Sequence, residues 1–155
     1  MIVGLDPGPT YSALVYFTGD RAQIPRYAEN ALILETVGLL NGEPLAIEMI
    51  ASYGMAVGQE VFETCVWIGR FAQAYDRQQQ KAAFVYRRDV KLHLCGSVRA
   101  RDTNVRQALI DKLGPVGTKK SPGPCYGISG DLWSALAVAV TYAEWSRCPR
   151  VIPAS

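Results

Sequence analysis

The sequence predicts a single α/β domain in which a mixed β-sheet of about five strands is flanked by helices on both faces. One observation is composition: 49% of the 155 residues are hydrophobic and 19% are charged, the balance of a globular protein. A chain of this length provides one domain, residues 1–155. The other observation is the order of elements, because three strand-like segments precede an alternation of helix-like and strand-like segments.

Three strands are expected at the N-terminus. Residues 1–5 are apolar and lead into the turn sequence DPGP, and the apolar, β-forming run SALVYF at 12–17 completes a hairpin. A second turn precedes a weaker third strand at 23–27. The next segment, 29–40, has the apolar spacing of a short helix that ends before Asn41-Gly42.

Two further strands and a long helix follow. The segment PLAI at 44–47 is expected to be a strand with Glu48 at its end, and residues 82–86 form another. Between them, residues 57–80 are the longest helix candidate, with an expected apolar stripe formed by Val61, Cys65, Ile68 and Ala72.

The last third of the chain is expected to be helical, with one long loop. Helices are predicted over 89–94, 101–113 and 129–145, and the last is rich in Ala and Val and should therefore be buried. The middle one carries Val105, Leu109 and Leu113 at fourfold spacing and ends at Gly114. The loop that follows is long enough to indicate a functional role.

Several classes of protein are not expected. No apolar run approaches the roughly 18 residues of a membrane span, and the N-terminus lacks the basic and apolar segments of a signal peptide. The four cysteines form no CxxC pair and the only histidine is His93, which makes a structural zinc site improbable. Reduced thiols in a cytoplasmic protein are the simpler interpretation.

Charge is distributed unevenly along the chain. The net charge is +2 overall, yet residues 1–80 carry four basic against nine acidic side chains, and residues 81–120 carry ten against three. A local net charge of +7 is typical of a surface that meets phosphates. The alternative is a solvated helix face, and charge alone favours nucleic acid only slightly.

Three carboxylates stand where solvated acids are uncommon. Asp6 and Glu48 each end an apolar strand, and Asp131 lies in the first turn of the most apolar helix. Burying such a group is costly unless it is paired or binds a cation. If the strands are adjacent and the helix crosses them, the three acids converge and suit Mg²⁺, a hard ion. Two such ions about 4 Å apart stabilise the attacking water and the leaving oxygen in phosphodiester cleavage.

Each acid also has a purely structural interpretation. Asp6 precedes Pro-Gly and is a common turn starter, and Asp131 would favour the helix dipole. Glu48 is the hardest to explain in this way, because its neighbours on both sides are hydrophobic. The three acids together therefore indicate a metal site more strongly than any one of them.

Four segments share a pattern with a known family, in order and over nearly the whole chain. They are IVGLDPGPTYSALVYF, LAIEMIASYGMAVGQEVFETCVWIGRF, VKLHLCGSVRARDTNVRQAL and GDLWSALAVAVTYAEW. The features are an I-x-G-[IL]-D-P-G strand, an A-I-E strand end before a helix, a VK-x-x-x-x-G segment before a helix, and an acid before an A-L-A-x-A core. Together they resemble RuvC-type Holliday junction resolvases of the ribonuclease H-like superfamily, and the short chain looks most like phage-borne members.

This resemblance implies a ribonuclease H-like fold, a homodimer, and symmetric nicking of four-way DNA junctions by two-metal-ion hydrolysis. Mg²⁺ is the expected cofactor, and Mn²⁺ is expected to substitute for it. Asp6, Glu48 and Asp131 match the family's metal ligands and are the expected catalytic residues. No nucleotide cofactor and no membrane are expected, and the location is the cytoplasm, that of the host for a phage-encoded protein.

The chain departs from the family pattern at two positions. A second acid is usual three residues along the last helix, where this chain has Ser134, a poor ligand. A lysine usual near the active site falls on Asp102. The resemblance then makes Asp102 a candidate fourth carboxylate, with Arg101 or Arg99 supplying positive charge. The alternative is that Asp102 caps the helix that begins there. With three acids only, affinity for a second ion should be lower.

Contacts with DNA are expected from basic residues that meet backbone phosphates, with little base specificity and strong salt dependence. Tyr53 is a candidate for stacking on an unpaired base, although a surface tyrosine is equally ordinary. The lysine pair in the long loop has the alternative of a flexible, solvated loop. The candidates are Arg87, Arg88, Lys91, Arg99, Arg101, Arg106, Lys119 and Lys120.

The long helix is a candidate dimer face through Phe62, Trp67 and Phe71, unless these residues belong to the core. Other functions also stay open, because one fold hosts several activities. A nuclease for flaps, other branched DNA or RNA–DNA hybrids is one, and a junction-binding module without catalysis is another. A sugar-kinase or actin-like protein would need two such domains and a longer chain.

Overall fold

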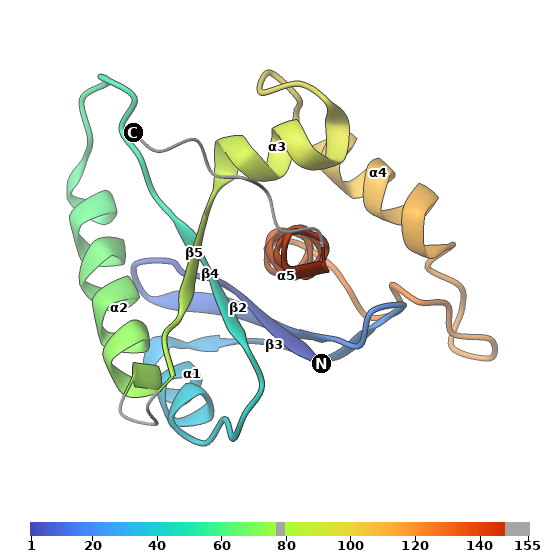
Figure 1. Ribbon diagram of the computed structural model, residues 1–155, viewed down its shortest axis with the longest axis horizontal. Helices are drawn as coiled ribbons and strands as arrows, with labels where there is room; N and C mark the ends of the chain where they lie inside the picture. Colours follow the sequence, from blue (N-terminus) through green and yellow to red (C-terminus); the bar gives the residue numbers. More distant parts are fainter. Residues whose placement is uncertain (77–79, 148–155) are drawn as a thin grey trace.

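The computed structural model describes residues 1–76 and 80–147, and they form a five-stranded sheet with helices on both faces (Figure 1). No helix among these residues has the length and apolarity to cross a membrane. The elements in order are β1 Ile2–Asp6, β2 Tyr11–Phe17, β3 Ala22–Glu29, α1 Asn30–Gly38, β4 Leu45–Met49, α2 Gln59–Asp76, β5 Ala83–Tyr86, α3 Arg87–Cys95, α4 Asp102–Leu113 and α5 Leu132–Arg147.

The sheet is mixed, with strand order β3-β2-β1-β4-β5. The first three strands are antiparallel neighbours, joined by the tight turns expected after β1 and β2. β4 pairs with β1 in parallel, and β5 pairs with β4 in parallel. Parallel pairing brings the carboxyl ends of β1, β4 and β5 to one edge of the sheet, which is where the acids at their ends meet.

Helix α5 covers one face of the sheet and is almost entirely buried, as its Ala and Val content predicts (Figure 1). It lies directly against β1, since a Cβ built on Gly4 would sit 2.0 Å from the carbonyl oxygen of Ala135. α3 and α4 pack beside α5 through Val90, Val105 and Leu109.

Helices α1 and α2 cover the other face, where their apolar side chains meet those of β1, β2 and β4. Of the stripe expected on the long helix, Ile68 is buried as predicted, Val61 and Ala72 are only partly buried, and Cys65 is exposed. The fully buried residues are Thr64, Ile68, Phe71 and Tyr75. Tyr75 fixes the C-terminal end of α2, because its hydroxyl donates to the carbonyl of Glu43 at 2.9 Å. The two residues are 32 positions apart, so the spacing of apolar residues within the helix does not predict this contact.

The ends of several elements differ from the sequence prediction by a few residues. The long helix begins at Gln59 and is described to Asp76, and the rest of its expected span reaches into 77–79, outside the described residues. The short helix expected over 89–94 begins at Arg87, immediately after β5. Three cysteines are free, as expected: Cys65, Cys95 and Cys125. Cys148 lies outside the described residues.

Candidate active site

Two acids meet at the carboxyl ends of β1 and β4. The parallel register of these strands places Asp6 beside Glu48. Because side chains alternate along a strand, each acid shares a face with the residue two positions earlier, Gly4 or Ala46, and both of those positions lie under α5. The Glu48 side chain is only 13% exposed. The sheet therefore holds a pair of carboxylates against the N-terminal end of α5.

The start of α5 supplies the third acid. The backbone carbonyl of Asp131 accepts hydrogen bonds from the N–H groups of Ser134 and Ala135, at 2.9 and 3.1 Å, so Asp131 stands at the helix N-terminus. Its side chain is exposed, and Ser134 is half-buried one turn later. The placement suits the helix dipole and also brings the Asp131 charge near Asp6, whose pKa it helps to raise.

The electrostatics of the pair are those of a site without enough positive charge. Burial raises the pKa of Asp6 from 3.8 to about 8, and the nearby Glu48 and Asp131 charges contribute to the increase. Arg87 and a hydrogen bond with Ser134 act in the opposite direction. Burial also raises the pKa of Glu48, opposed mainly by Arg87. Two carboxylates that lose their hydration together are stabilised by a cation that binds both.

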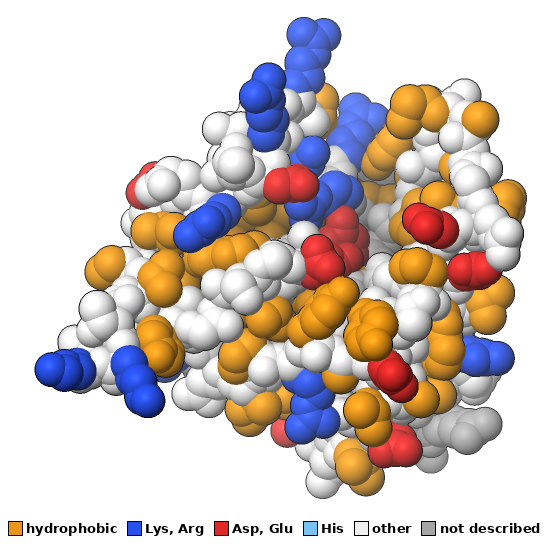
Figure 2. Space-filling model, turned by 180° about the vertical axis from the view of Figure 1, so that it is seen from behind, with side chains coloured by type: hydrophobic (Ala, Val, Ile, Leu, Met, Phe, Trp, Pro, Cys, Tyr) orange, Lys and Arg blue, Asp and Glu red, His pale blue; other side chains and the backbone are white. Residues whose placement is uncertain are grey.

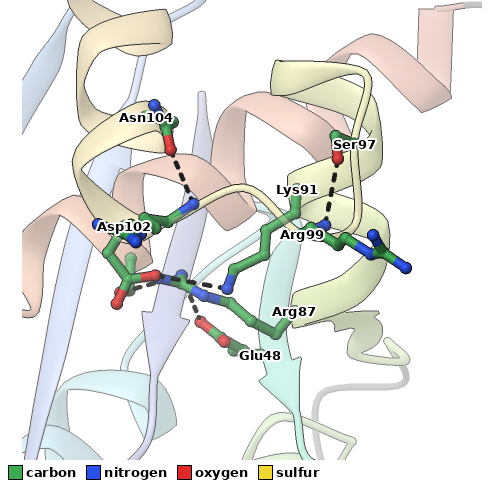
Figure 3. A network of polar contacts seen from close by, with 9 residues as sticks. Glu48, Arg87, Lys91, Ser97, Arg99, Asp102 and Asn104 are labelled. Carbon is green, nitrogen blue, oxygen red and sulfur yellow. Dashed lines mark hydrogen bonds and ion pairs between the residues drawn. The ribbon is translucent and has the colours of Figure 1, made fainter.

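Arg87 provides the one cationic group that touches this acidic pair in the part of the chain described. Its Nη1 donates to the Ser134 hydroxyl at 3.1 Å and lies 3.5 Å from Glu48 Oε2. Its Nη2 donates to Asp102 Oδ1 at 2.6 Å. In Figure 3 the guanidinium group lies between Glu48 and Asp102. The side chain is 24% exposed, so it belongs to the site more than to the outer surface.

Asp102 lies at the rim of the site. Its side chain is 75% exposed and forms ion pairs with Arg87 and, at 3.8 Å, with Lys91. These partners lower the pKa of Asp102, the hydrogen bond with Arg87 first. The N-cap of α4 is Arg101, whose backbone N–H donates to Asn104 Oδ1 at 2.8 Å. The Asp102 side chain therefore bonds to Arg87 and does not cap the helix.

The donor set fits a divalent cation by chemistry and by charge. Among the residues described, no three acidic, histidine or cysteine side chains stand close enough to form a ready-made ion cage. The available donors at the sheet edge are hard carboxylate oxygens, which Mg²⁺ prefers. A divalent ion bound by Asp6 and Glu48 would reduce the repulsion that contributes to their raised pKa values. Asp131, exposed at the mouth, is the third donor within electrostatic reach of Asp6.

Comparison with known proteins gives a result for structure and none for sequence. No protein-family model and no curated protein sequence matches the chain. The Thermus thermophilus RuvC structure matches with a TM-score of 0.69 at 20% identity, over 94% of this chain and 95% of that one. T. thermophilus RuvC in complex with Holliday junction substrate matches with the same TM-score at 22% identity, over 94% of each chain. This chain has the fold of RuvC.

The RuvC likeness confirms the predicted fold class, a ribonuclease H-like mixed sheet of five strands with helices on both faces. The family recognised from four sequence segments is also the family of these structural neighbours. At identities this low the likeness establishes the fold, so the metal ligands and the substrate are argued below from this chain's own residues.

The residues proposed for DNA contact lie on the RuvC-like fold in two groups. Arg87, Arg88 and Lys91 of α3 line a cavity of about 350 Å³ together with Tyr53, from the loop after β4. Figure 2 shows acidic side chains in a recess in the middle of one face, with Lys and Arg above them. The residues proposed farther along the chain, all exposed, are Arg99, Arg101, Arg106, Lys119 and Lys120.

Individual members of these groups differ in their surroundings. Arg106 stacks over the ring of Trp133, with 5.2 Å between its guanidinium carbon and the ring centroid, and lines the cavity beside Asp131. Arg99 points away from the ion pairs of Arg87 (Figure 3). Tyr53 is 56% exposed and has a φ of 48°, an uncommon backbone conformation for a residue with a side chain.

Sequence reasoning missed the place of Arg87 inside the site, because it was grouped with the phosphate-binding surface. The observation that places Arg87 in the site is a strand pairing. β5 pairs in parallel with β4 so that Glu48 faces Val85. Arg87, directly after β5, therefore reaches the same sheet edge as Glu48. The strand order that reveals this neighbourhood depends on tertiary structure and is absent from local spacing.

Proposed function

We propose that this chain, acting as a single domain of residues 1–155, is a divalent-metal-dependent endonuclease that nicks four-way DNA junctions. The observation that carries the proposal is the pair of desolvated carboxylates, Asp6 and Glu48, at the adjacent ends of β1 and β4. Basic side chains of α3 lie beside this pair. The shared fold with RuvC, one structure of which holds a Holliday junction substrate, supports the choice of substrate.

The chemistry is phosphodiester hydrolysis. A water oxygen forms a bond to phosphorus, one P–O ester bond breaks, and the water proton leaves as the departing oxygen takes up a proton. When bound, Mg²⁺ or Mn²⁺ supplies charge that stabilises the phosphorane-like transition state and makes water a better nucleophile. Asp6, Glu48 and Asp131 would hold the metal. A two-ion mechanism is the finer form of the proposal, and it normally draws on a fourth acid where this chain has Ser134.

DNA would approach over α3 and the loop after β4. Arg88 and Lys91 lie beside Tyr53 in the cavity next to the acids, where they can bind phosphates while the tyrosine ring stacks on an unpaired base. At the crossover of a four-way junction the strands exchange partners, so the bases there unpair and unstack more easily than those of plain duplex. This arrangement favours a branched substrate over a regular duplex.

Symmetric nicking requires two active sites, and we propose a homodimer that includes the outer surface of α2. Phe62 and Val66 are 62% and 56% exposed there, while Phe71 is completely buried in the core. The dimer face proposed from the sequence therefore has to be reduced to Phe62 and its exposed neighbours, with Trp67 partly buried at its margin.

To test the proposed nuclease activity, the purified protein is incubated with a synthetic four-way junction, a flap, an RNA–DNA hybrid and plain duplex, with and without Mg²⁺. Asp6→Asn is run in parallel to exclude a contaminating nuclease. Paired symmetric nicks in the junction that require both Mg²⁺ and Asp6 are the expected result. Cleavage of flaps or hybrids at the same rate would move the function to general branch processing. Junction binding without cleavage would refute the catalytic proposal and leave a binding module.

A further inference from the structure

Arg87 and Ser134 form a contact at the place where the site lacks an acid. Asp131 directly precedes α5 and Ser134 follows it three residues later in the first turn, so the two residues line the same cavity at the start of the helix. The Ser134 hydroxyl accepts a hydrogen bond from Arg87 Nη1 at 3.1 Å. A carboxylate at this position would lie beside Asp6, whose side chain forms a hydrogen bond with Ser134. The serine is neutral and holds a cationic side chain instead.

The contacts of Arg87 fix its charge next to the acids. One edge of the guanidinium group contacts Glu48 and Ser134. The other edge donates to Asp102 at 2.6 Å, so that the group lies between Glu48 and Asp102 (Figure 3). Asp102 is itself exposed and paired with Lys91. Arg87 is thus anchored at both edges, by α5 and β4 on one side and by α4 on the other. Arginine stays protonated in proteins, so its positive charge is permanent.

Charge balance gives this contact a consequence for metal binding. Asp6, Glu48, Asp131 and Asp102 together carry four negative charges when ionised. One divalent ion, Arg87 and Lys91 carry four positive charges, so they neutralise the four acids. A second divalent ion would bring an excess of two positive charges, beside a guanidinium group that stands 3.5 Å from Glu48. Like charges in a partly buried site repel strongly.

The cavities on either side of Arg87 show where its remaining donors can act. One cavity, of about 340 Å³, includes Asp131 and Ser134 in its lining. The other, of about 350 Å³, includes Tyr53, Arg88 and Lys91. Arg87 lines both. A phosphate bound in either cavity is therefore within reach of Arg87, whose planar fork of N–H donors matches phosphate oxygens.

We propose that the site binds one divalent ion, and that Arg87 takes the place of the second ion by donating to the scissile phosphate. This inference rests on the proposed nuclease function and replaces its two-ion form. Arg87 is then a catalytic residue, because it contacts the reacting phosphate. Asp102 is a positioning residue, because it holds the outer edge of the guanidinium group.

The first test counts ions and does not depend on cleavage. Mn²⁺ is titrated into the full chain without DNA, and bound ions are counted by electron paramagnetic resonance. The wild type is expected to bind one Mn²⁺, and Arg87→Gln combined with Ser134→Asp is expected to bind two. Arg88→Gln combined with Ser134→Asp is the matched control, because it removes a neighbouring positive charge that does not contact Glu48, Ser134 or Asp102. This control should bind a second ion less tightly than the variant that lacks Arg87. Two ions of comparable affinity on the wild type would overturn the proposal.

The second test addresses the phosphate contact. Junction affinity is measured in EDTA over a range of salt concentrations for the wild type, Arg87→Gln and Arg87→Lys. Loss of one phosphate contact should reduce the slope of log K against log salt by about 1 in Arg87→Gln, and Arg87→Lys should restore it. An unchanged slope in Arg87→Gln would overturn the phosphate role.

The outcomes separate this inference from the proposed function. A wild type that binds two ions and nicks junctions keeps the nuclease and refutes the single-ion site. A wild type that binds no Mn²⁺ and cleaves no substrate refutes both. Circular dichroism of each variant shows whether it folds, and Arg87→Lys retains a charge at the site if Arg87→Gln does not fold.

Discussion

Replacement of Asp6 by asparagine should change how the stability of the metal-free protein depends on pH. The pKa of Asp6 is about 8 in the folded protein against 3.8 for an ordinary aspartate, chiefly because of burial. Between these values the folded chain holds a proton that the unfolded chain has released. Unfolding then releases a proton, so the free energy of unfolding falls as pH rises through this window. The asparagine side chain has no such proton, and the fall should be absent in the variant.

The magnitude follows from the slope of the linkage relation. One proton corresponds to about 1.4 kcal/mol per pH unit at 25 °C. Between pH 5 and pH 7 the wild type should therefore lose roughly 3 kcal/mol of stability relative to Asp6→Asn. Both pH values lie inside the window between 3.8 and about 8, and the full difference requires that the pKa of Asp6 in the folded protein stays above 7.

Urea denaturation in EDTA at pH 5, 6 and 7 measures this difference. Groups that titrate in both proteins largely cancel when the two are compared. Asp111→Asn, at an exposed acid on α4, is the control and should run parallel to the wild type. Parallel curves for the wild type and Asp6→Asn would refute the reasoning, since they would mean that Asp6 is ionised in the folded protein throughout this range.

Four further predictions concern metal binding, packing and assembly. Mg²⁺ must displace the Asp6 proton, so calorimetry in buffers of different ionisation enthalpy should detect proton release at pH 7. The affinity for Mg²⁺ should rise with pH up to about pH 8. Binding without proton release would contradict this prediction. Gly4→Ala places a Cβ 2.0 Å from the Ala135 carbonyl oxygen and should cost about 1–3 kcal/mol or more in denaturant unfolding, and an unchanged midpoint would show that α5 can shift. Phe71→Ala should cost about 3–5 kcal/mol because Phe71 is fully buried. Phe62→Ala should leave stability within about 0.5 kcal/mol at a concentration where the chain is monomeric and weaken self-association in sedimentation experiments, and unaltered association would remove the α2 surface from the dimer.

The strand and helix order could be predicted from the sequence because each element carries its own local signal. Turn sequences end β1 and β2, and the Ala- and Val-rich composition of the last helix indicates its burial. The buried face of α2 could not be obtained in the same way. The polar residue Thr64 lies on the inner side together with Ile68, while the apolar Phe62 lies on the outer side. Packing against β4 and α1 selects that face, and helical spacing alone does not.

The convergence of two acids could also be predicted, since an acid at the end of an apolar strand is conspicuous in the sequence. Asp6 and Glu48 do lie side by side. Their cationic neighbour could not be predicted, because Arg87 is one of ten basic residues in a forty-residue stretch and has no local feature that separates it from the rest. Arg87 is distinguished by the pairing of β5 with β4, which places the residue after β5 at the same sheet edge as Glu48.

Ser134 and Arg87 are best understood as a single structural arrangement. With a serine at 134 and no arginine beside it, the site would have only Asp6, Glu48 and Asp131 as ligands for a second ion. It would also have no positive charge to replace that ion. Arg87 alone, beside an acid at position 134, would form an ion pair there and compete with metal for that carboxylate. With a neutral hydroxyl at 134, the guanidinium group is held at 3.1 Å and keeps donors for a phosphate. The departure from the family pattern that first counted against catalysis therefore becomes, with Arg87 beside it, an argument for catalysis with fewer ions.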